Sequence, residues 1–594
     1  MNGLSLRAMQ WIASFLAGCL MSFMAGPAQA QPTVAPAPQP AAQELALTPL
    51  EIKAVATITC IGVEWTVRGD SNANATGTLE YRQASEADWK PAFPLHRSPA
   101  RPAEAARFQG GFKQYADRHL NANYLAGSVI GLKPDTKYEL RVTLNDPDGG
   151  GASKTVSVAT RPVPVIPKDG RVVEVRGGGA ALKQAAEAAQ PGDVLMVHAG
   201  KYEGGIVVEA KGTAKKPVCI AAAGDGEVLL HGGDAPKGPL MGIRVTGTFV
   251  RIQGLSFYNF QECVRGDPSA GNLAVMRCKM DHFFTAIYSR ANDGYFADNT
   301  IRQSFNALDP AVDPGERNEG HGIHLSTETS GAVVCYNAVS LVADGVRLWG
   351  RDSDCIGNDV IFNVDDGIEL DAGGPNLRVI DNRWSFTGQN GISFQPYIGG
   401  PAYILRNLVI GDKENAIKNR YSSEAGVFVN NTLICFDGSA NDLPYGSYTR
   451  NNLLLTIPGK GRSSARVNTS KERLAALDMD YDGIGPMGIN GINAKDFAAQ
   501  TGLEKHGLQF DNDEEVLAKV PGPFPQYMSE QWTVPEAFLK DMTRPHPDLS
   551  LKAGSKAIGA GIAIPNLMER ADGKAPDLGA WQFGQPVPHY GPRP

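Results

Sequence analysis

The sequence has few cysteines, little excess charge and no uninterrupted hydrophobic run of the length that spans a membrane. Its 594 residues include 8 cysteines and no C-x-x-C pair, which argues against a disulfide scaffold and a structural zinc site. The formal net charge of -7 argues against nucleic acid as the main partner. Because no apolar stretch reaches about 20 residues, no transmembrane helix is expected.

Glycine and proline are abundant. The 67 glycines and 40 prolines are typical of a turn-rich protein built from β-strands. The chain is also too long for one compact core. The composition therefore predicts an all-β protein with more than one domain.

Residues 1–30 have the three parts of an export signal. Arg7 supplies a positive charge, an apolar run follows, and Ala28-Gln29-Ala30 forms a small-x-small cleavage site. An alternative is a lipobox ending at Cys19, which would then become the lipidated N-terminus. The first route predicts a periplasmic or secreted protein, and the second predicts a lipoprotein. Residues 31–47 are rich in Pro, Ala and Gln and are expected to form a linker.

Residues 48–163 contain short alternating runs bounded by turn residues, as the strands of a β-sandwich do. Trp65 lies on an early strand, and the segment from Leu132 to Tyr138 has the form of a tyrosine corner. These features resemble a fibronectin type III domain, and the resemblance implies a spacer or a carbohydrate-surface module. Residues 97–123 exceed the usual connection and are expected to extend over the next domain.

Residues 170–460 contain a repeat marked by one Asn in each unit, with spacings of 38, 21, 24, 25, 24 and 21 residues. The marked residues are Asn299, Asn337, Asn358, Asn382, Asn407, Asn431 and Asn452. Spacings near 23 predict a right-handed parallel β-helix of about eleven coils, with the Asn residues in an internal amide ladder. The longer first interval predicts a loop at residues 306–319 beside the functional face.

A second strand follows each marked Asn, and its alternation directs one set of side chains outward. Equivalent positions in neighbouring coils lie about 4.8 Å apart, so the outward residues form two columns on the floor of one groove. The first column contains Tyr288, His324, Arg347, Glu369, Ser393 and Lys418, and the second contains Ser326, Trp349, Asp371, Gln395 and Arg420. The residues predicted to bind substrate without reacting are Tyr288, Trp349, Ser393 and Gln395.

Both ends of this region resemble known families. Ala188–Val194 and Gly200–Tyr202 resemble the first turns of pectate-lyase-like β-helix enzymes, especially the chondroitinase B and alginate lyase group. Ala575–Trp581 resembles the terminal segment of secreted bacterial β-helix proteins, and residues 461–594 are expected to pack as an irregular segment on the helix. The resemblance implies the fold and a polysaccharide ligand, but the fold hosts lyases, hydrolases, epimerases and adhesins.

The outward columns supply the residue types that a glycan lyase needs. A lyase requires a base for the C5 proton of a uronic acid and a cation facing the carboxylate. The candidates for these roles are His324, Arg347, Lys418 and Arg420. The resemblance to the chondroitinase B group implies that Lys418 is the base and Arg420 its partner. The leading prediction is therefore a lyase that cleaves an anionic glycan by β-elimination.

The same columns support a hydrolase. Glu369 and Asp371 are expected two residues apart on one strand face, with Cα atoms about 6.7 Å apart. This spacing is compatible with the roughly 6.5–9.5 Å between the carboxyl groups of inverting glycosidases. Asp365 and Asp366 precede them and are candidate Ca²⁺ ligands, although turn formation before a glycine is the simpler role for Asp366 and for Asp344.

Gly320-His321-Gly322 and the pair Asp365-Asp366 resemble motifs of polygalacturonases. They occur in reversed order, so that family's catalytic roles are not carried over. The open alternatives are a lyase, an inverting glycoside hydrolase that uses Glu369 and Asp371, and a non-enzymatic glycan-binding surface protein. Each would act on a polysaccharide, and a monomer is expected.

Overall fold

The computed structural model describes residues 45–594, except for 111–112, 236–237, 306–319, 413–414, 421–424, 436–440, 457–462 and 522–546. The predicted export signal, Cys19 and the predicted loop at 306–319 lie outside the described residues. Within the described residues, no helix has both the length and the apolar character needed to cross a membrane.

The N-terminal part contains two four-stranded antiparallel sheets. One consists, in spatial order, of β1 (Thr48–Ala56), β2 (Cys60–Arg68), β6 (Tyr124–Ile130) and β5 (His96–Ser98). The other consists of β4 (Lys90–Pro91), β3 (Thr76–Gln83), β7 (Lys137–Asn145) and β8 (Gly151–Ala159). Trp65 and Leu140, from different sheets, share one buried core. The Tyr138 hydroxyl accepts a hydrogen bond from the Lys133 N–H at 2.9 Å, as the predicted corner requires. The sandwich is thus present as small antiparallel sheets, and its assignment to the fibronectin type III family stays a prediction.

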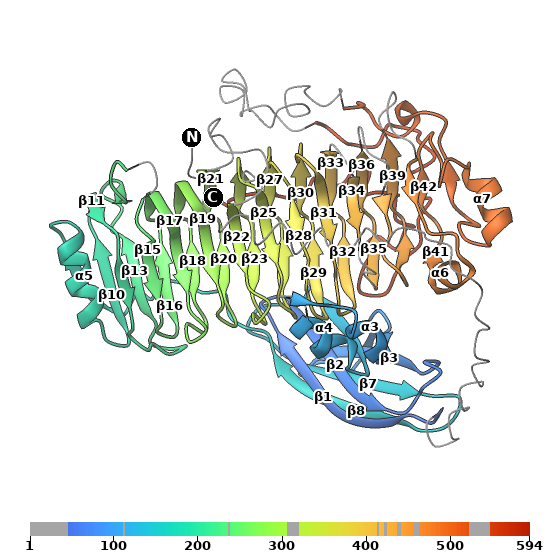
Figure 1. The fold of residues 1–594 in the computed structure, drawn as a ribbon, viewed down its shortest axis with the longest axis horizontal. Helices are drawn as coiled ribbons and strands as arrows, with labels where there is room; N and C mark the ends of the chain where they lie inside the picture. The colour runs from blue at the N-terminus through green and yellow to red at the C-terminus, as the bar shows by residue number, and fades with distance from the viewer. Residues whose placement is uncertain are drawn as a thin grey trace, which may run out of the picture. The chain divides into compact units, whose positions relative to one another are not determined.

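Three rows of parallel strands build the β-helix that follows (Figure 1). Row 1 is a 13-stranded sheet made of β9 (Arg171–Val175), β10 (Asp193–Val197), β13 (Val218–Ala222), β16 (Val250–Gln253), β18 (Ala274–Met276), β20 (Tyr295–Ala297), β23 (Val333–Cys335), β26 (Asp354–Ile356), β29 (Leu377–Ile380), β32 (Ala402–Leu405), β35 (Gly426–Val429), β38 (Tyr448–Arg450) and β41 (Asp478–Met479). Each coil contributes one strand to this row. The expectation of about eleven coils was therefore too low, because the first coils lack the Asn mark and β41 lies beyond residue 460.

A second, 20-stranded sheet contains rows 2 and 3. Row 2 contains β11 (Gly200–Glu203), β14 (Val228–His231), the first halves of β17 (Ser256–Gly266) and β19 (Lys279–Ser289), β21 (Thr300–Ser304), β24 (Ala338–Ser340), β27 (Asp359–Ile361), β30 (Arg383–Ser385), β33 (Leu408–Asp412), β36 (Thr432–Cys435), β39 (Leu453–Thr456), β42 (Gly483–Ile484) and β43 (Leu508–Gln509). Row 3 contains β12 (Ile206–Val208), β15 (Met241–Val245), the second halves of β17 and β19, β22 (His321–Leu325), β25 (Asp344–Leu348), β28 (Ile368–Glu369), β31 (Asn390–Phe394) and β34 (Asn415–Asn419).

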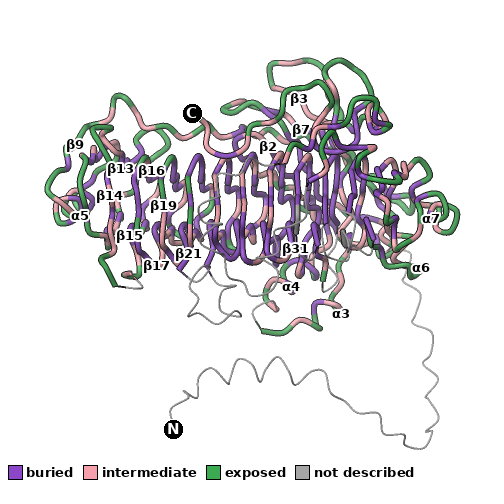
Figure 2. Tube along the Cα trace, turned by 90° about the horizontal axis from the view of Figure 1, so that it is seen from above, coloured by how far each residue is buried: buried purple, intermediate pink, exposed green. Residues whose placement is uncertain are grey.

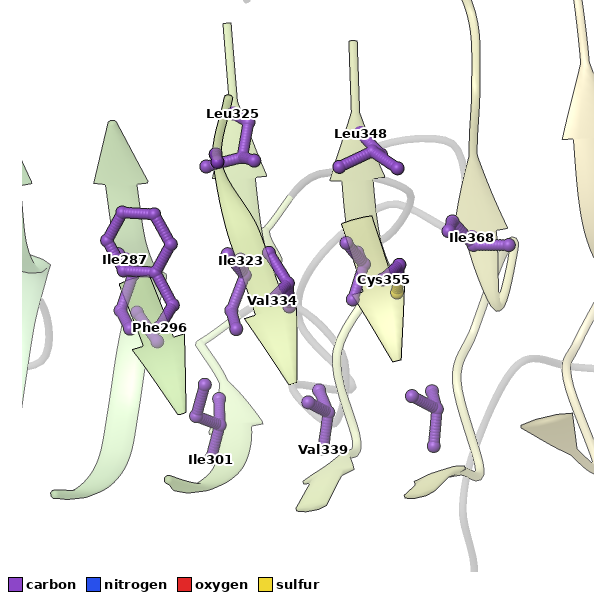
Figure 3. Packing of buried hydrophobic residues seen from close by; sticks show 14 of the residues in the cluster. Ile287, Phe296, Ile301, Ile323, Leu325, Val334, Val339, Leu348, Cys355 and Ile368 are labelled. Atoms are coloured by element: carbon purple, nitrogen blue, oxygen red, sulfur yellow. The ribbon is translucent and has the colours of Figure 1, made fainter. Parts of the chain in front are cut away.

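The side chains between the three rows form one continuous hydrophobic core. Figure 3 shows equivalent residues stacked from coil to coil, with Ile323 and Ile368 from row 3 beside Val334 and Cys355 from row 1. These residues are fully buried, as the alternation predicted. Figure 2 shows the same pattern along the chain, with buried residues on the coils and exposed residues on many of the connections. The N-terminal end of the core is covered by α5 (Gly179–Ala188), which buries Leu182 and Ala186.

The marked Asn residues form the predicted amide ladder. Asn337 is typical, because its side-chain N–H group donates to the Phe296 carbonyl and to Asn358 Oδ1, both at 2.9 Å. The ladder extends beyond the marked residues at both ends. The Cys278 N–H donates to Asn299 Oδ1 at 3.0 Å, and the Asn452 N–H donates to Asp482 Oδ1 at 2.7 Å. The ladder supplies buried turn backbone with partners where no strand can do so.

Removing one rung of the ladder should be costly. Asn382 Oδ1 accepts the Asn358 N–H at 2.9 Å, and the Asn382 side chain donates to the Cys355 carbonyl at 2.8 Å. Asn382→Ala leaves both groups buried without partners, so we expect the free energy of unfolding to fall by about 2 kcal/mol in a urea titration. Ser340→Ala, at a half-buried strand position, is the control and should change stability by about 0.5 kcal/mol or less. If both variants lost the same unfolding free energy, the amide ladder would not contribute specially to stability.

The C-terminal part covers the last coils. It contains β37 (Asn441–Asp442) paired with β40 (Ala465–Arg466), and the helices α6 (Lys471–Ala476), α7 (Ala494–Thr501) and η2 (Asp513–Glu515). Phe510 and Leu578 pack against Leu408 and Ile434 on the outer face of row 2. Described residues of this segment therefore contact the outer face of row 2, and the assignment of 461–594 as a separate segment stays a prediction. The seven cysteines of the described chain are all buried, and none of them forms a disulfide.

Candidate functional site

Row 3 aligns the first outward column as the sequence predicted. The strand register places Tyr288, His324, Arg347, Glu369, Ser393 and Lys418 opposite one another in successive coils. Parallel pairing therefore brings residues that are more than 100 positions apart in sequence onto one face. The register fixes their neighbours but does not by itself assign roles to them.

Asp344 lies at the centre of a buried group of charges. The His321 ring contacts its carboxylate at 3.1 Å, and Arg347 contacts it at 2.8 Å. Arg347 also reaches Glu369 on the next coil, with Nε 2.6 Å from Oε2. Burial opposes ionisation of Asp344, but Arg347 and His321 hold its pKa well below the usual range. The sequence suggested only a turn role for Asp344; it is instead an ionised member of this group.

Asp366 forms a second ion pair beside the first. Lys418 lies 2.8 Å from its Oδ2, and the Asn390 side chain donates to its Oδ1 at 2.8 Å. The Asp366 N–H donates to Asp344 Oδ1 at 3.1 Å, which links the two groups. Burial opposes the charge of Lys418, but Asp366 holds the pKa of that lysine above its usual range. Lys418 is therefore a firmly charged partner of Asp366.

Oxygen atoms of Asp344, Asp366 and Glu369 all lie within 4.8 Å of one another, a spacing that a metal ion could bridge. The surrounding contacts do not suit Ca²⁺, which requires six to eight oxygen ligands. Arg347 and Lys418 already supply positive charge to the carboxylates, and both oxygens of Asp366 have side-chain partners. The predicted calcium role of Asp366 is thus not supported by its contacts.

Three further carboxyl groups hold their protons more tightly than usual. Burial and the neighbouring Asp344 raise the pKa of Glu369 well above its usual range. Burial and the neighbouring Asp366 do the same to Asp365. Burial raises the pKa of Asp371 to about 7, although Lys418 acts in the opposite direction. Five carboxyl groups thus share two permanent cations, so some of them remain protonated near neutral pH.

Asp371 is held by the next coil. Its Oδ1 accepts hydrogen bonds from the Ser393 hydroxyl at 3.2 Å and from the Gln395 N–H at 2.7 Å. Ser393 therefore positions a carboxylate, a role different from the substrate contact that the sequence predicted. The fixed carboxylate lies two residues beyond Glu369 on the same chain segment.

Aromatic rings continue the site toward the earlier coils. His324 lies between Tyr288 and Trp349, with ring centroids 4.9 Å from each, and Arg347 lies over the Trp349 ring at 5.0 Å. Burial, His321 and Arg347 lower the pKa of His324 well below its usual value, so its ring is neutral near neutral pH. An aromatic surface next to carboxyl groups is suited to a sugar ring.

Several buried polar atoms of the site have no hydrogen-bond partner among the described residues. They are Nε1 of Trp349, Oδ1 of Asp365 and Oε1 of Gln395. Unpaired buried polar groups are rare in native proteins, and a bound ligand is one way to satisfy them. One donor and two acceptors are therefore available at this face.

The N-terminal part adds residues at the end of these strands. Its inserted segment contains α3 (Pro102–Ala105) and α4 (Lys113–Leu120), and Ala105, Ala116 and Leu120 pack against Ala372 and Ile398. Ala372 directly follows Asp371, so the insertion lies immediately beside the carboxylates. The predicted extension of residues 97–123 over the next domain is confirmed by these contacts.

Arg420 differs from the other predicted residues. It is exposed and lines a pocket of about 150 Å³ with Asn419, Leu443, Tyr445 and Arg473. Its backbone N–H donates to the Phe394 carbonyl at 2.9 Å, which confirms its place in the second column.

Among the comparisons with known proteins, only the one with solved structures found similar proteins. No family model matches the sequence, and no curated protein matches it. A family 28 exopolygalacturonase from Yersinia enterocolitica aligns at 13% identity and a TM-score of 0.28, covering 74% of this chain and 93% of that chain. The catalytic domain of a GH87 alpha-1,3-glucanase, in complex with nigerose, aligns at 13% identity and a TM-score of 0.23, covering 69% and 89%. The A-module of the Azotobacter vinelandii mannuronan C-5 epimerase AlgE4 aligns at 13% identity and a TM-score of 0.25, covering 48% and 93%.

Proposed function

We propose that the protein is a carbohydrate-active enzyme that hydrolyses a polysaccharide with Glu369 as general acid and Asp371 as general base. The observation that carries the proposal is the pair itself. Asp371 follows Glu369 by two residues, in the turn just after β28, so the strand is shorter than the sequence predicted; the surroundings raise both pKa values, Glu369 well above its usual range and Asp371 to about 7. Acid–base hydrolysis needs two neighbouring carboxyl groups, one protonated as the acid and one ionised as the base.

In this reaction the proton of Glu369 passes to the glycosidic oxygen as the bond from that oxygen to the anomeric carbon breaks. Ionised Asp371 removes a proton from water, and the water oxygen forms the new bond to the anomeric carbon. Glu369 ends deprotonated and Asp371 protonated, and exchange with solvent restores both. Attack by water on the opposite side of the sugar from the acid gives inversion.

The other charged residues set the electrostatics of the pair. Burial and the negative charge of Asp344 keep the acid Glu369 protonated, while Lys418 favours the ionised form of Asp371. Trp349 and Gln395 supply a free donor and a free acceptor for sugar hydroxyl groups. Tyr288 and His324 extend the surface along the glycan.

A lyase is the second candidate, and one observation favours it. His324 is neutral and half-buried, so it could accept a C5 proton. The expected base Lys418 is less suitable, because Asp366 keeps it charged. Arg347 contacts two carboxylates, which reduces its attraction for a uronate.

The reaction class can be tested with a panel of acidic and neutral polysaccharides. Hydrolysis should release reducing ends without absorbance near 235 nm, whereas β-elimination produces unsaturated uronates that absorb there. Absorbance that rises in step with the reducing ends would replace the hydrolase with the lyase. Binding without either signal would favour the non-enzymatic alternative.

The pH dependence tests the role assigned to Lys418. Because Asp371 must be ionised to act as base, we expect kcat/KM to rise with pH through about 7. Lys418→Met removes a cation that lowers the pKa of Asp371, so this rise should move to higher pH by about one unit or more. Lys418→Arg keeps the positive charge and should leave the rise of kcat/KM at the same pH. Lys471→Met, at an exposed lysine of α6, is the control and should also leave the rise unchanged. An unchanged profile in Lys418→Met, with its melting temperature preserved, would exclude this coupling.

A further inference from the structure

A pocket of about 480 Å³ lies on the outer face of the first coils, separate from the carboxylate group. Row 2 builds it from β11, β14, β17, β19 and β21. Its lining residues are Lys201, Glu227, Leu229, His231, Ser256, Phe257, Tyr258, Lys279, Met280, Asp281, Thr300 and Arg302. The function proposed above uses none of these side chains.

Stacked rings form one part of this pocket region. The Tyr258 ring stacks on His231 at 5.2 Å and on His282 at 5.4 Å, and His282 meets the edge of Phe305 at 4.8 Å. Parallel pairing produces the stack, because His231 and Tyr258 occupy the same register position in neighbouring coils. Tyr258 is nevertheless 39% exposed. A large aromatic side chain that stays exposed in a pocket is typical of a binding surface.

Three cations line the same pocket without ion pairs to any described residue. They are Lys201, Lys279 and Arg302. Most arginines of the coils, in contrast, pair with a carboxylate, as Arg244 does with Asp267 and Arg383 with Asp359. In the register, Lys279 lies opposite Thr300, two residues before Arg302, so the two cations have Cα atoms about 8 Å apart. That spacing lets both reach one anionic group.

We propose that this pocket is a second glycan-binding site, which takes an acidic sugar with its carboxylate on Lys279 and Arg302 and its ring beside His231 and Tyr258. A carboxylate fits better than a neutral sugar, because Lys279 and Arg302 make no salt bridge among the described residues, and Asp281, which lies opposite Arg302 in the register, is the one carboxylate that acts on Arg302 from within the lining. Glu227 and Asp281 also line the pocket and offer acceptors for hydroxyl groups.

The strands connect this pocket with row 3. β17 carries Tyr258 in its first half and Arg265 in its second half, and β19 carries Lys279 and Tyr288 in the same way. Arg265 lies over the Tyr288 ring at 4.9 Å, and Tyr288 contacts His324. A long glycan could therefore contact both surfaces. The pocket would bind the glycan away from the site of cleavage. This raises the effective concentration of the polymer at the carboxylates.

The test measures binding separately from turnover. Trigalacturonate and trimannuronate are the acidic probes, and cellotriose is the neutral probe of equal length. All three are titrated calorimetrically into the full chain carrying Glu369→Gln. Lys279→Ala combined with Arg302→Ala should weaken one acidic binding event at least tenfold. Lys183→Ala combined with Lys215→Ala removes the same charge from exposed positions and should leave binding unchanged. Added salt should weaken the acidic event, because it depends on charge.

The proposal is overturned if the Lys279 and Arg302 double variant binds both acidic probes as tightly as the control, or if neither probe binds at millimolar concentration. Cellotriose binding that equals acidic binding would also overturn it. Activity of the chain without Glu369→Gln is assayed in parallel on the polysaccharide panel. Loss of binding in a protein inactive on every glycan would support this site and reject the hydrolase. Activity on a glycan, together with unchanged binding in the Lys279 and Arg302 double variant, would support the hydrolase and reject this site.

Discussion

Glu369→Gln is expected to lower kcat by about 10²–10⁴-fold, the range that a general acid contributes. The amide has the shape of the protonated acid but cannot transfer a proton, so the melting temperature should stay close to that of the unsubstituted chain. Asp371→Asn should cause a loss of similar size, because it removes the base. Both are measured as initial rates of reducing-end release on one active substrate.

Glu328→Gln is the matched control for charge and shape. Glu328 lies two coils before Glu369, in the turn after β22, where it pairs with Arg290 and is exposed. Its activity should stay within about twofold of the unsubstituted rate. If Glu369→Gln and Asp371→Asn both retained activity at the level of this control, the acid–base assignment would be wrong. A large loss in Arg347→Ala alone would instead favour the lyase candidate.

Arg378→Ala is expected to lower the free energy of unfolding by about 3–5 kcal/mol, because it leaves a buried charge without its partner. Arg378 is fully buried and binds Asp354, its register neighbour in row 1. The N-terminal part completes the group, since Thr57 donates to Asp354 and Arg378 donates to Ser128. The variant should therefore weaken the attachment of the N-terminal part as well as the coil.

Arg383→Ala is the matched control, because Arg383 makes the same cross-coil pair with Asp359 in row 2. That pair is partly exposed and should contribute about 1 kcal/mol or less. Urea unfolding of both variants gives the comparison. Replacing both partners, as Arg378→Met with Asp354→Leu, should recover much of the loss. If Arg378→Ala and Arg383→Ala lowered the unfolding free energy equally, the buried network would stabilise the protein no more than the partly exposed pair does.

The repeat made the helix predictable from sequence. One Asn in each coil fixed the register, and with it the column from Tyr288 to Lys418, because parallel coils align equivalent positions. The ends of the ladder escaped this reasoning. Cys278 joins it through its backbone N–H and Asp482 through its carboxylate, so no repeated Asn marks these positions.

The chemistry of the column was harder to predict. Asp344 precedes a glycine in the sequence, and nothing there distinguishes a turn residue from a buried carboxylate that pairs with Arg347 and His321. The pairing of Lys418 was equally hard to predict. Lys418 and Asp366 are 52 positions apart, and they meet only because the coils stack. Residue types and columns follow from the sequence, whereas protonation follows from the partners that the fold brings together.

The most direct test of the hydrolase is mass spectrometry of every product formed from one defined oligosaccharide that the protein cleaves. Hydrolysis predicts that the two fragments together exceed the mass of the substrate by one water molecule. β-Elimination predicts fragments whose masses sum to that of the substrate, with one unsaturated end. The first result would support the acid–base pair of Glu369 and Asp371, and the second would contradict it.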